Sequence, residues 1–165
     1  MQTITLETRI AAPVERCFLL SLSIDLHQET ASATGERAIA GVTSGILGPG
    51  ETVTFRGRHF GLWLTHKTRI TGYSRPDWFQ DSMEQGIFRL FVHDHFFFSD
   101  SSGTLMRDHL RFAAPLAVLG WFAERALLRR YLTGFLTERN RELKSIAESV
   151  DGNWRRFVPG SVWSR

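Results

Sequence analysis

Cysteine is nearly absent from this sequence, which contains one, Cys17, among 165 residues. A single cysteine cannot form a disulfide within the chain, so nothing points to an oxidising compartment. The sequence also lacks an apolar run of the roughly 20 residues that a membrane-spanning helix needs. Its first ten residues alternate between polar and apolar, unlike the apolar core of a signal peptide. We therefore expect a cytoplasmic protein with no integral membrane segment.

Tyrosine is also scarce, with 2 residues against 13 phenylalanines. Phenylalanine contributes a large apolar surface without a polar group, which predicts a bulky, apolar interior. Hydrophobic residues make up 42% of the chain and charged residues 22%, a balance typical of globular rather than disordered proteins. The length fits one domain, which we place at residues 1–150, followed by a C-terminal tail at 151–165.

The net charge of +3 is concentrated in residues 123–144, which hold six basic residues against three acidic ones. One interpretation is the solvated face of an amphipathic helix, and the other is a basic patch for nucleic acid or an anionic membrane surface. The segment lacks both a nucleic-acid-binding motif and aromatic residues interleaved with the basic ones. The pattern therefore favours a solvated helix face, and we expect no nucleic-acid partner.

Hydrophobic periodicity predicts an α+β fold. Alternation predicts a strand at residues 2–10 and helical spacing predicts two short helices at 13–22 and 24–30. Further strands are predicted at 35–41, 51–60, 62–73, 78–84, 87–98 and 104–113. The short breaks between them favour an antiparallel meander. Apolar residues at three-and-four spacing predict a long helix at about 116–149. The expected architecture is a curved antiparallel sheet of six or seven strands wrapped around this C-terminal helix.

The tail after residue 150 is rich in aromatic residues. Trp154, Phe157 and Trp163 are too apolar for a solvated linker. We expect the tail to pack either on the domain or on a second copy of the chain, which would make a homodimer. The alternative is a disordered end.

Several separated motifs agree with this order of elements: Ala12-Pro13 with Phe18, the run ETVTFRGRHFG at 51–61, Phe79-x-Asp81-x-x-x-Gln85-Gly86-x-Phe88, His93-x-His95-x-Phe97 and Gly103-Thr104-x-Met106-x-Asp108. Over residues 2–149 the chain resembles the START/Bet v 1-like (SRPBCC) superfamily, also called the polyketide cyclase/dehydrase and lipid transport superfamily, and within it an uncharacterised bacterial subgroup. The resemblance implies a helix-grip fold with a deep hydrophobic cavity. The superfamily includes lipid carriers, hormone-binding proteins, cyclases and ring hydroxylase subunits, so the fold alone does not select a function.

Strand alternation predicts which side chains line such a cavity, because every second residue of a strand points to the same face. Each predicted inward face mixes apolar residues with one or two polar ones, as binding cavities do. The side chains that we expect to contact a ligand are Phe55, Phe79, Met83, Gln85, Phe91, Met106, Leu110, Phe112, Phe122, Leu127 and Tyr131.

Five ionisable residues share these predicted faces: His59, Asp81, His93, His95 and Asp108. His93 and His95 are two residues apart, so they lie on one side of their strand. The other side of that strand is equally apolar, and the pattern alone does not decide which side faces inward. His27, His66 and His109 have no partner visible in the sequence, and we predict no role for them.

Three interpretations of this set remain open. The His and Asp side chains can satisfy one another's hydrogen bonds inside a wet cavity. A histidine oriented by Asp81 or Asp108 can also move protons on a bound carbonyl compound, as in aldol cyclisation or dehydration. A His-x-His pair with a carboxylate can finally bind zinc or iron, although the spacing alone is a weak signal.

The sequence contains no specific catalytic signature. The predicted function is therefore binding of a small hydrophobic ligand that is lipid-like, isoprenoid or aromatic, without a cofactor or metal. The alternative is a cyclase or dehydratase that uses a His–Asp pair in the same cavity.

Overall fold

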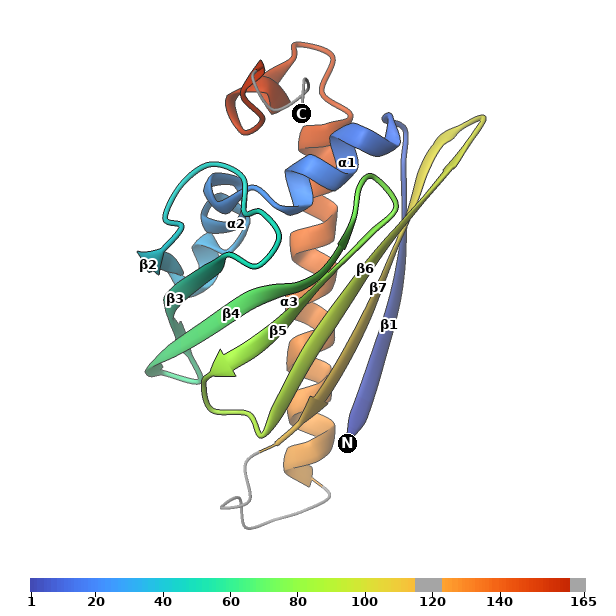
Figure 1. The fold of residues 1–165 in the computed structure, drawn as a ribbon. Helices are drawn as coiled ribbons and strands as arrows, with labels where there is room; N and C mark the ends of the chain where they lie inside the picture. The colour runs from blue at the N-terminus through green and yellow to red at the C-terminus, as the bar shows by residue number, and fades with distance from the viewer. Residues whose placement is uncertain (115–122, 161–165) are drawn as a thin grey trace.

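The computed structural model describes residues 1–114 and 123–160, and its main feature is an antiparallel sheet curved around a long helix (Figure 1). The described residues form seven strands in the order β1-β7-β6-β5-β4-β3-β2. Their bounds are β1 (Gln2–Ile10), β2 (Arg37–Gly41), β3 (Thr52–His59), β4 (Leu62–Ser74), β5 (Trp78–Gln85), β6 (Leu90–Asp100) and β7 (Gly103–Ala113). The predicted meander is confirmed, because β2 to β7 pair in sequence order and β1 adds beside β7.

Two short helices, α1 (Val14–Ser21) and α2 (Ile24–Thr30), connect β1 to β2, as predicted. Pro13 directly precedes α1, and the Ser23 side chain caps α2 by accepting a hydrogen bond from the Leu26 amide. The long helix α3 (Ala123–Ala147) spans 25 residues, or about 37 Å, and lies along the concave face of the sheet (Figure 1). The predicted first turns of this helix, at 116–122, lie outside the described residues. No described helix is long and apolar enough to cross a membrane.

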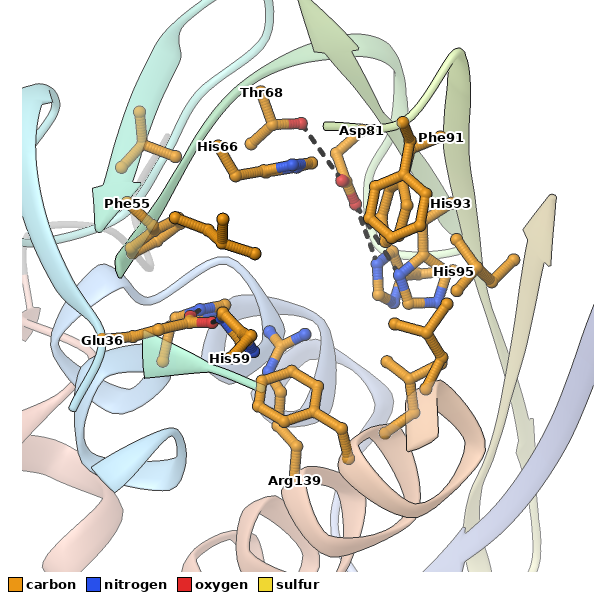
Figure 2. Close-up of a pocket in the computed structure, with 18 of the residues that line it drawn as sticks. Glu36, Phe55, His59, His66, Thr68, Asp81, Phe91, His93, His95 and Arg139 are labelled. Atoms are coloured by element: carbon orange, nitrogen blue, oxygen red, sulfur yellow. Dashed lines mark hydrogen bonds and ion pairs between the residues drawn. The ribbon is translucent and has the colours of Figure 1, made fainter. Parts of the chain in front are cut away.

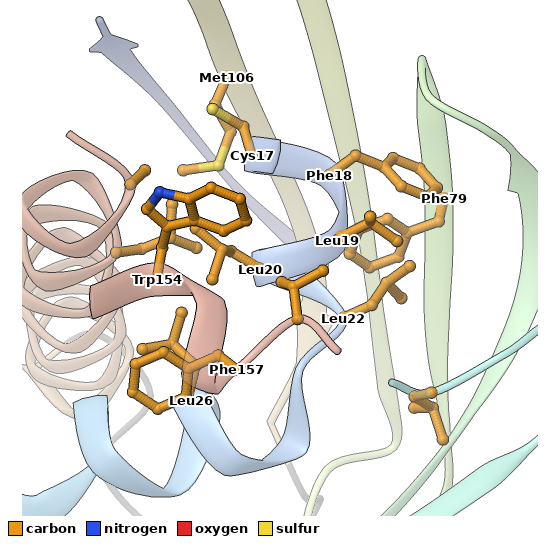
Figure 3. Close-up of a cluster of buried hydrophobic side chains, with 14 of the residues drawn as sticks. Cys17, Phe18, Leu19, Leu20, Leu22, Leu26, Phe79, Met106, Trp154 and Phe157 are labelled. Carbon is orange, nitrogen blue, oxygen red and sulfur yellow. The ribbon is translucent and has the colours of Figure 1, made fainter. Parts of the chain in front are cut away.

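The larger hydrophobic core lies where α1 and α2 meet the sheet (Figure 3). The Phe18 ring packs edge-on against Tyr73, Phe79 and Phe97, with centroid distances of 5.4 to 5.6 Å. Aromatic rings favour this geometry because the positive edge of one ring meets the negative face of another. Cys17, also on α1, is fully buried in the same core. Helix α1 is therefore fixed on the sheet by ring packing.

The C-terminal tail packs on the domain. After α3 the chain turns into a short 3₁₀ helix, η2 (Asn153–Arg156). Trp154, Phe157 and Val158 are buried in the core beside α1 and α2 (Figure 3). The Arg16 guanidinium lies 4.3 Å from the centre of a Trp154 ring, in cation–π geometry. The expected packing of the tail on its own domain is therefore present for Trp154 and Phe157, and Trp163 lies outside the described residues.

A second hydrophobic cluster joins α3 to β1 and β7. It contains Ile4, Leu110, Phe112, Leu132 and Leu136. The two helical residues are four apart and lie on the same face of α3, as the predicted apolar stripe requires. The space between this cluster and the larger core holds the candidate site.

Candidate functional site

A cavity of about 170 Å³ lies between the concave face of the sheet and α3. A cavity that holds a single water molecule measures roughly 10–15 Å³ on the same scale. The cavity here is more than ten times larger, which leaves room for a small organic molecule. The apolar part of the lining includes Val53, Phe55, Ile70, Phe79, Phe91, Leu110, Leu132 and Leu136. The β3–β4 turn, the β5–β6 loop and the first described turns of α3 also contribute lining residues, among them Phe60, Ile87 and Leu128.

The structure places His93 and His95 of β6 on the inward face, which the sequence pattern left open. Their exposed fractions are 3% and 4%, and both line the cavity. Asp94, between them, points to the outer face of the sheet. There its carboxylate accepts hydrogen bonds from Trp78 Nε1 at 3.2 Å and Gln80 Nε2 at 2.7 Å. Because Trp78 and Gln80 satisfy the Asp94 carboxylate on the outer face, β6 can direct both histidines toward the cavity.

Five of the predicted ligand-contacting residues line the cavity: Phe55, Phe79, Phe91, Leu110 and Tyr131. Five others do not, and for them the predicted placement is wrong: Met83, Gln85, Met106, Phe112 and Leu127. Phe122 lies outside the described residues.

The end of β5 leaves the inward face because strand pairing shifts there. Lys67 of β4 pairs with Gln85, whereas the next residue, Thr68, pairs with Met83. This bulge breaks the alternation on which the prediction rested. Gln85, which follows the bulge, is consequently exposed. Met83 precedes the bulge and pairs with Thr68, but its half-buried side chain lies beside Gly86 and does not line the cavity.

The other three corrections have separate causes. Met106 is buried under α1, where its sulfur lies 3.7 Å from Ser21 Oγ. Phe112 lies in the second hydrophobic cluster, with its ring against Phe88. Leu127 is 59% exposed. The face of α3 that points to the cavity contains Leu128 instead. The predicted apolar stripe was therefore shifted by one residue at this position.

Asp81, His93, His95 and Asp108, which we call the Asp81 cluster, lie together on one side of the cavity, where the first three contribute to its lining (Figure 2). Asp81 Oδ2 lies 3.1 Å from His95 Nε2 and 4.0 Å from His93 Nδ1. Asp108 Oδ1 lies 2.8 Å from His95 Nδ1 and 3.1 Å from His93 Nε2. The predicted proximity of these four residues is therefore present, although Asp108 lies behind the two rings and does not itself line the cavity.

Further hydrogen bonds hold both carboxylates of the Asp81 cluster in place. Asn140 of α3 donates from Nδ2 to Asp108 Oδ2 over 2.6 Å. Thr68 of β4 donates from Oγ1 to Asp81 Oδ1 over 3.2 Å. Because each carboxylate is fixed by a neighbouring element, the positions of the two imidazoles are fixed as well.

Burial and mutual pairing shift the pKa values within this cluster in different directions. Burial opposes ionisation of Asp81 and Asp108, but hydrogen bonds and charge attraction from the two histidines outweigh it and hold both pKa values below the ordinary range. Burial lowers the pKa of His93, and the neighbouring His95 lowers it further. Burial also opposes the charging of His95, but its hydrogen bonds to both carboxylates outweigh this and raise its pKa.

A second polar group, which we call the Glu36 cluster, consists of His27, Glu36, His59 and Tyr131 and lies on a different side of the cavity (Figure 2). Glu36 Oε2 lies 2.7 Å from His27 Nε2, and its Oε1 lies 3.0 Å from His59 Nε2. The other nitrogen of His59, Nδ1, lies 2.6 Å from the Tyr131 hydroxyl. The predicted site residue His59 is thus separated from the other four and has different partners.

The Glu36 cluster depends on a glycine of β3. A Cβ atom at Gly57 would lie 2.5 Å from Glu36 Cγ, so only glycine leaves room for this side chain. Burial opposes ionisation of Glu36, but the hydrogen bonds from His27 and His59 hold its pKa below the ordinary range. Burial lowers the pKa of His27, and the charge of Arg139 adds to this effect. Glu36 is therefore a buried carboxylate between two imidazoles.

Several charged or polar residues of this cavity were not predicted from the sequence, among them His27, Glu36 and Arg139. Glu36 precedes a short strand and His27 lies on a short helix, so no periodic pattern links them. Arg139 was assigned to a solvated helix face, yet it lines the cavity. The available signal was its helical spacing from Leu132, Leu136 and Leu143, which places it beside the apolar stripe. His66, for which no role was predicted, also lines the cavity, with its ring edge-on to Phe91.

Solved structures with the same fold are similar to this chain at low sequence identity. A START superfamily protein from Mycobacterium smegmatis superposes with a TM-score of 0.67 at 12% identity, covering 88% of this chain and 97% of that one. Ginseng major latex-like protein 151 from Panax ginseng gives 0.65 at 15% identity, with 90% and 98% covered. The protein TTHA0849 from Thermus thermophilus gives 0.69 at 13% identity, with 87% and 95% covered.

These comparisons confirm the predicted fold. The chain has the helix-grip fold of START and Bet v 1-like proteins, with two short helices after the first strand and the long C-terminal helix against the sheet. No protein-family model and no curated protein sequence matches the chain. At identities of 12–15% the likeness establishes the fold, and function has to be argued from the site.

Proposed function

We propose that this protein binds a small, largely apolar organic molecule in the cavity between the sheet and α3. The cavity itself carries the proposal, because its walls are mainly apolar while a few polar side chains reach into it. This combination is typical of small-molecule sites, where apolar surface provides affinity and polar groups fix orientation. A lipid-like, isoprenoid or aromatic ligand fits this chemistry, as the sequence predicted.

Two exposed apolar side chains support an entrance for such a ligand. Phe60, at the β3–β4 turn, is 54% exposed, and Ile87, in the β5–β6 loop, is 40% exposed, yet both contribute to the cavity lining. The Phe60 ring also contacts Tyr131 of α3, with centroids 4.4 Å apart. An apolar ligand entering here would meet apolar side chains before it reached the interior.

Arg139 suggests that the ligand carries a hydrogen-bond acceptor. Its side chain lines the cavity, and it makes no ion pair of 4 Å or less with any described residue. Guanidinium groups bind carboxylates and other planar acceptors through paired N–H donors. We therefore expect the polar end of the ligand to be a carboxylate or a carbonyl oxygen near α3, with the apolar body toward Phe55 and Phe91.

A fluorescence assay with 1-aminoanthracene, a small apolar probe, tests this proposal. Leu64 of β4 lines the cavity, so Leu64→Trp should fill part of it and weaken probe binding at least tenfold. Leu62→Trp is the matched control, because Leu62 is 65% exposed and does not line the cavity. Probe binding that is equal in both variants, with both folded by circular dichroism, would contradict the proposal.

The Glu36 cluster favours a second candidate function, acid–base catalysis on the bound ligand. If His59 carries its proton on Nε2, facing Glu36, then Nδ1 can accept the Tyr131 hydroxyl proton. A carboxylate, an imidazole and a phenol would then form a proton relay at the cavity. An enzyme of the cyclase or dehydratase type could use such a relay. His59 was a predicted catalytic candidate, but its carboxylate partner here is Glu36 rather than the predicted aspartate.

Carrier and enzyme can be separated with the molecule recovered from protein purified from its own host. A carrier should return that molecule unchanged after prolonged incubation. An enzyme should convert it, or its precursor, and His59→Gln should abolish conversion while changing affinity less than about threefold. A variant that loses affinity and conversion together would count against a catalytic role for His59.

A further inference from the structure

The Asp81 cluster has the arrangement of a metal site. One potential ligand atom from each of Asp81, His93 and His95 lies within 4.8 Å of the other two. A tetrahedral zinc ion with bonds of 2.0–2.1 Å holds its ligand atoms about 3.3 Å apart. The distances from Asp81 Oδ2, 3.1 Å to His95 Nε2 and 4.0 Å to His93 Nδ1, lie on either side of this value.

Asp108 occupies the place of the carboxylate that supports metal-binding histidines. One of its oxygens faces the two ring nitrogens that point away from Asp81, at 2.8 Å from His95 Nδ1 and 3.1 Å from His93 Nε2. Histidines that bind metals usually donate their second N–H to such a group, which fixes the tautomer. With protons on these two nitrogens, the lone pairs of His95 Nε2 and His93 Nδ1 both face Asp81.

In the part of the chain that the structure describes, the two carboxylates of the Asp81 cluster have no cationic partner other than the two histidines. Asp108 is 1% exposed and the Asp81 side chain 18% exposed, and among the described residues only histidines lie within ion-pair distance of their carboxylates. The contact of Asp108 Oδ1 with His93 Nε2 is an ion-pair distance of 3.1 Å rather than a well-directed hydrogen bond. Buried charges are costly unless they are paired or coordinate a metal. A divalent cation held by Asp81 and the two rings would supply the positive charge that these carboxylates lack.

We propose that Asp81, His93 and His95 bind a divalent transition-metal ion, with Asp108 as the carboxylate that positions both rings. Two imidazoles and one carboxylate suit zinc and iron(II). All three proposed ligands line the cavity, so an open coordination position would face the bound molecule. A carbonyl or carboxylate oxygen of that molecule, or a water, could occupy it. The proposal concerns metal binding alone and does not depend on the organic ligand.

Calorimetric titration of chelator-treated protein with Zn²⁺ alone tests the site. We expect one ion per chain, and Co²⁺ in place of Zn²⁺ should give the visible absorption of a low-symmetry site. Asp81→Asn and His95→Gln should each abolish stoichiometric binding. Asp108→Asn should leave the stoichiometry at one but weaken binding about ten- to a hundredfold.

Two histidine variants serve as controls. His109→Gln changes the neighbour of Asp108 on the other face of β7, and His59→Gln changes the Glu36 cluster in the same cavity. Both should bind Zn²⁺ as the unchanged protein does. The absence of stoichiometric binding by the unchanged protein would overturn the proposal without any variant having to fold. Binding that survives in Asp81→Asn and His95→Gln, or that is lost in His59→Gln, would overturn this choice of ligands.

Discussion

Replacing Asp108 with asparagine tests how much the buried charges of the cavity wall contribute to stability. Asp108 is 1% exposed, and its oxygens lie 2.8 Å from His95 Nδ1 and 2.6 Å from Asn140 Nδ2. Asparagine keeps the size of the side chain but removes its charge. It also brings an amide donor toward two groups that both donate. Removing one partner of a buried ion pair typically costs about 3–5 kcal/mol.

We therefore expect Asp108→Asn to lower the free energy of unfolding by about 3–5 kcal/mol. In a chain of this length each kcal/mol shifts the melting temperature by roughly 2–4 °C, which predicts a decrease of about 6–20 °C. The measurement is urea unfolding followed by circular dichroism, supplemented by a thermal melt. A chelator should be present, so that a bound metal ion does not add to the stability of either protein.

Asp100→Asn is the matched control for this experiment. Asp100 is on the surface, where it pairs with Arg9 at 2.8 Å and its side chain is 42% exposed. Surface ion pairs contribute at most about 1 kcal/mol, so this change should have little effect. A loss of less than about 1 kcal/mol in Asp108→Asn, or equal losses in the two variants, would refute the argument that the buried carboxylate holds this wall together.

Three further predictions concern other parts of the molecule. Gly57→Ala should displace the Glu36 side chain and lower the free energy of unfolding in urea by about 1–3 kcal/mol, whereas a change below about 0.5 kcal/mol would show that the close approach of 2.5 Å is easily relieved. Trp154→Ala should cost about 3 kcal/mol in the same assay because the ring is buried in the core, and a neutral effect would mean that the tail does not stabilise the domain. Burial lowers the pKa of His27 in the folded protein below its ordinary value of 6.5. As the pH falls through 6.5, this histidine is protonated in the unfolded chain but not in the folded one, so the free energy of unfolding decreases. His27→Gln should remove this contribution and make the unfolding free energy less pH-dependent between about pH 7 and 5, while an unchanged slope would contradict a buried, neutral His27.

Local patterns were sufficient to predict the elements of the fold. Each strand shows alternation and each break contains turn residues, so the meander follows from neighbouring residues alone. The same alternation placed Phe55 and His59 correctly on the inward face of β3. It failed at Gln85, because a bulge is set by pairing with β4 and leaves no mark in the sequence of β5.

The candidate site was harder to predict because it depends on contacts between distant segments. Glu36 contacts His27 and His59 only after α2, the start of β2 and the end of β3 have come together. The inward orientation of His93 likewise depends on partners for Asp94 that lie on β5 and β7. Individual strands indicated which residues share a face, but only the packed sheet determined which face encloses the cavity.

Native mass spectrometry of protein purified from its own host tests the central claim, that the cavity binds a small and largely apolar molecule. The account predicts one organic molecule per chain, bearing a carboxylate or carbonyl group, and its loss in the Leu64→Trp variant but not in Leu62→Trp. A chain that carries no organic molecule, and that also fails to bind 1-aminoanthracene or to lose it in Leu64→Trp, would contradict the claim.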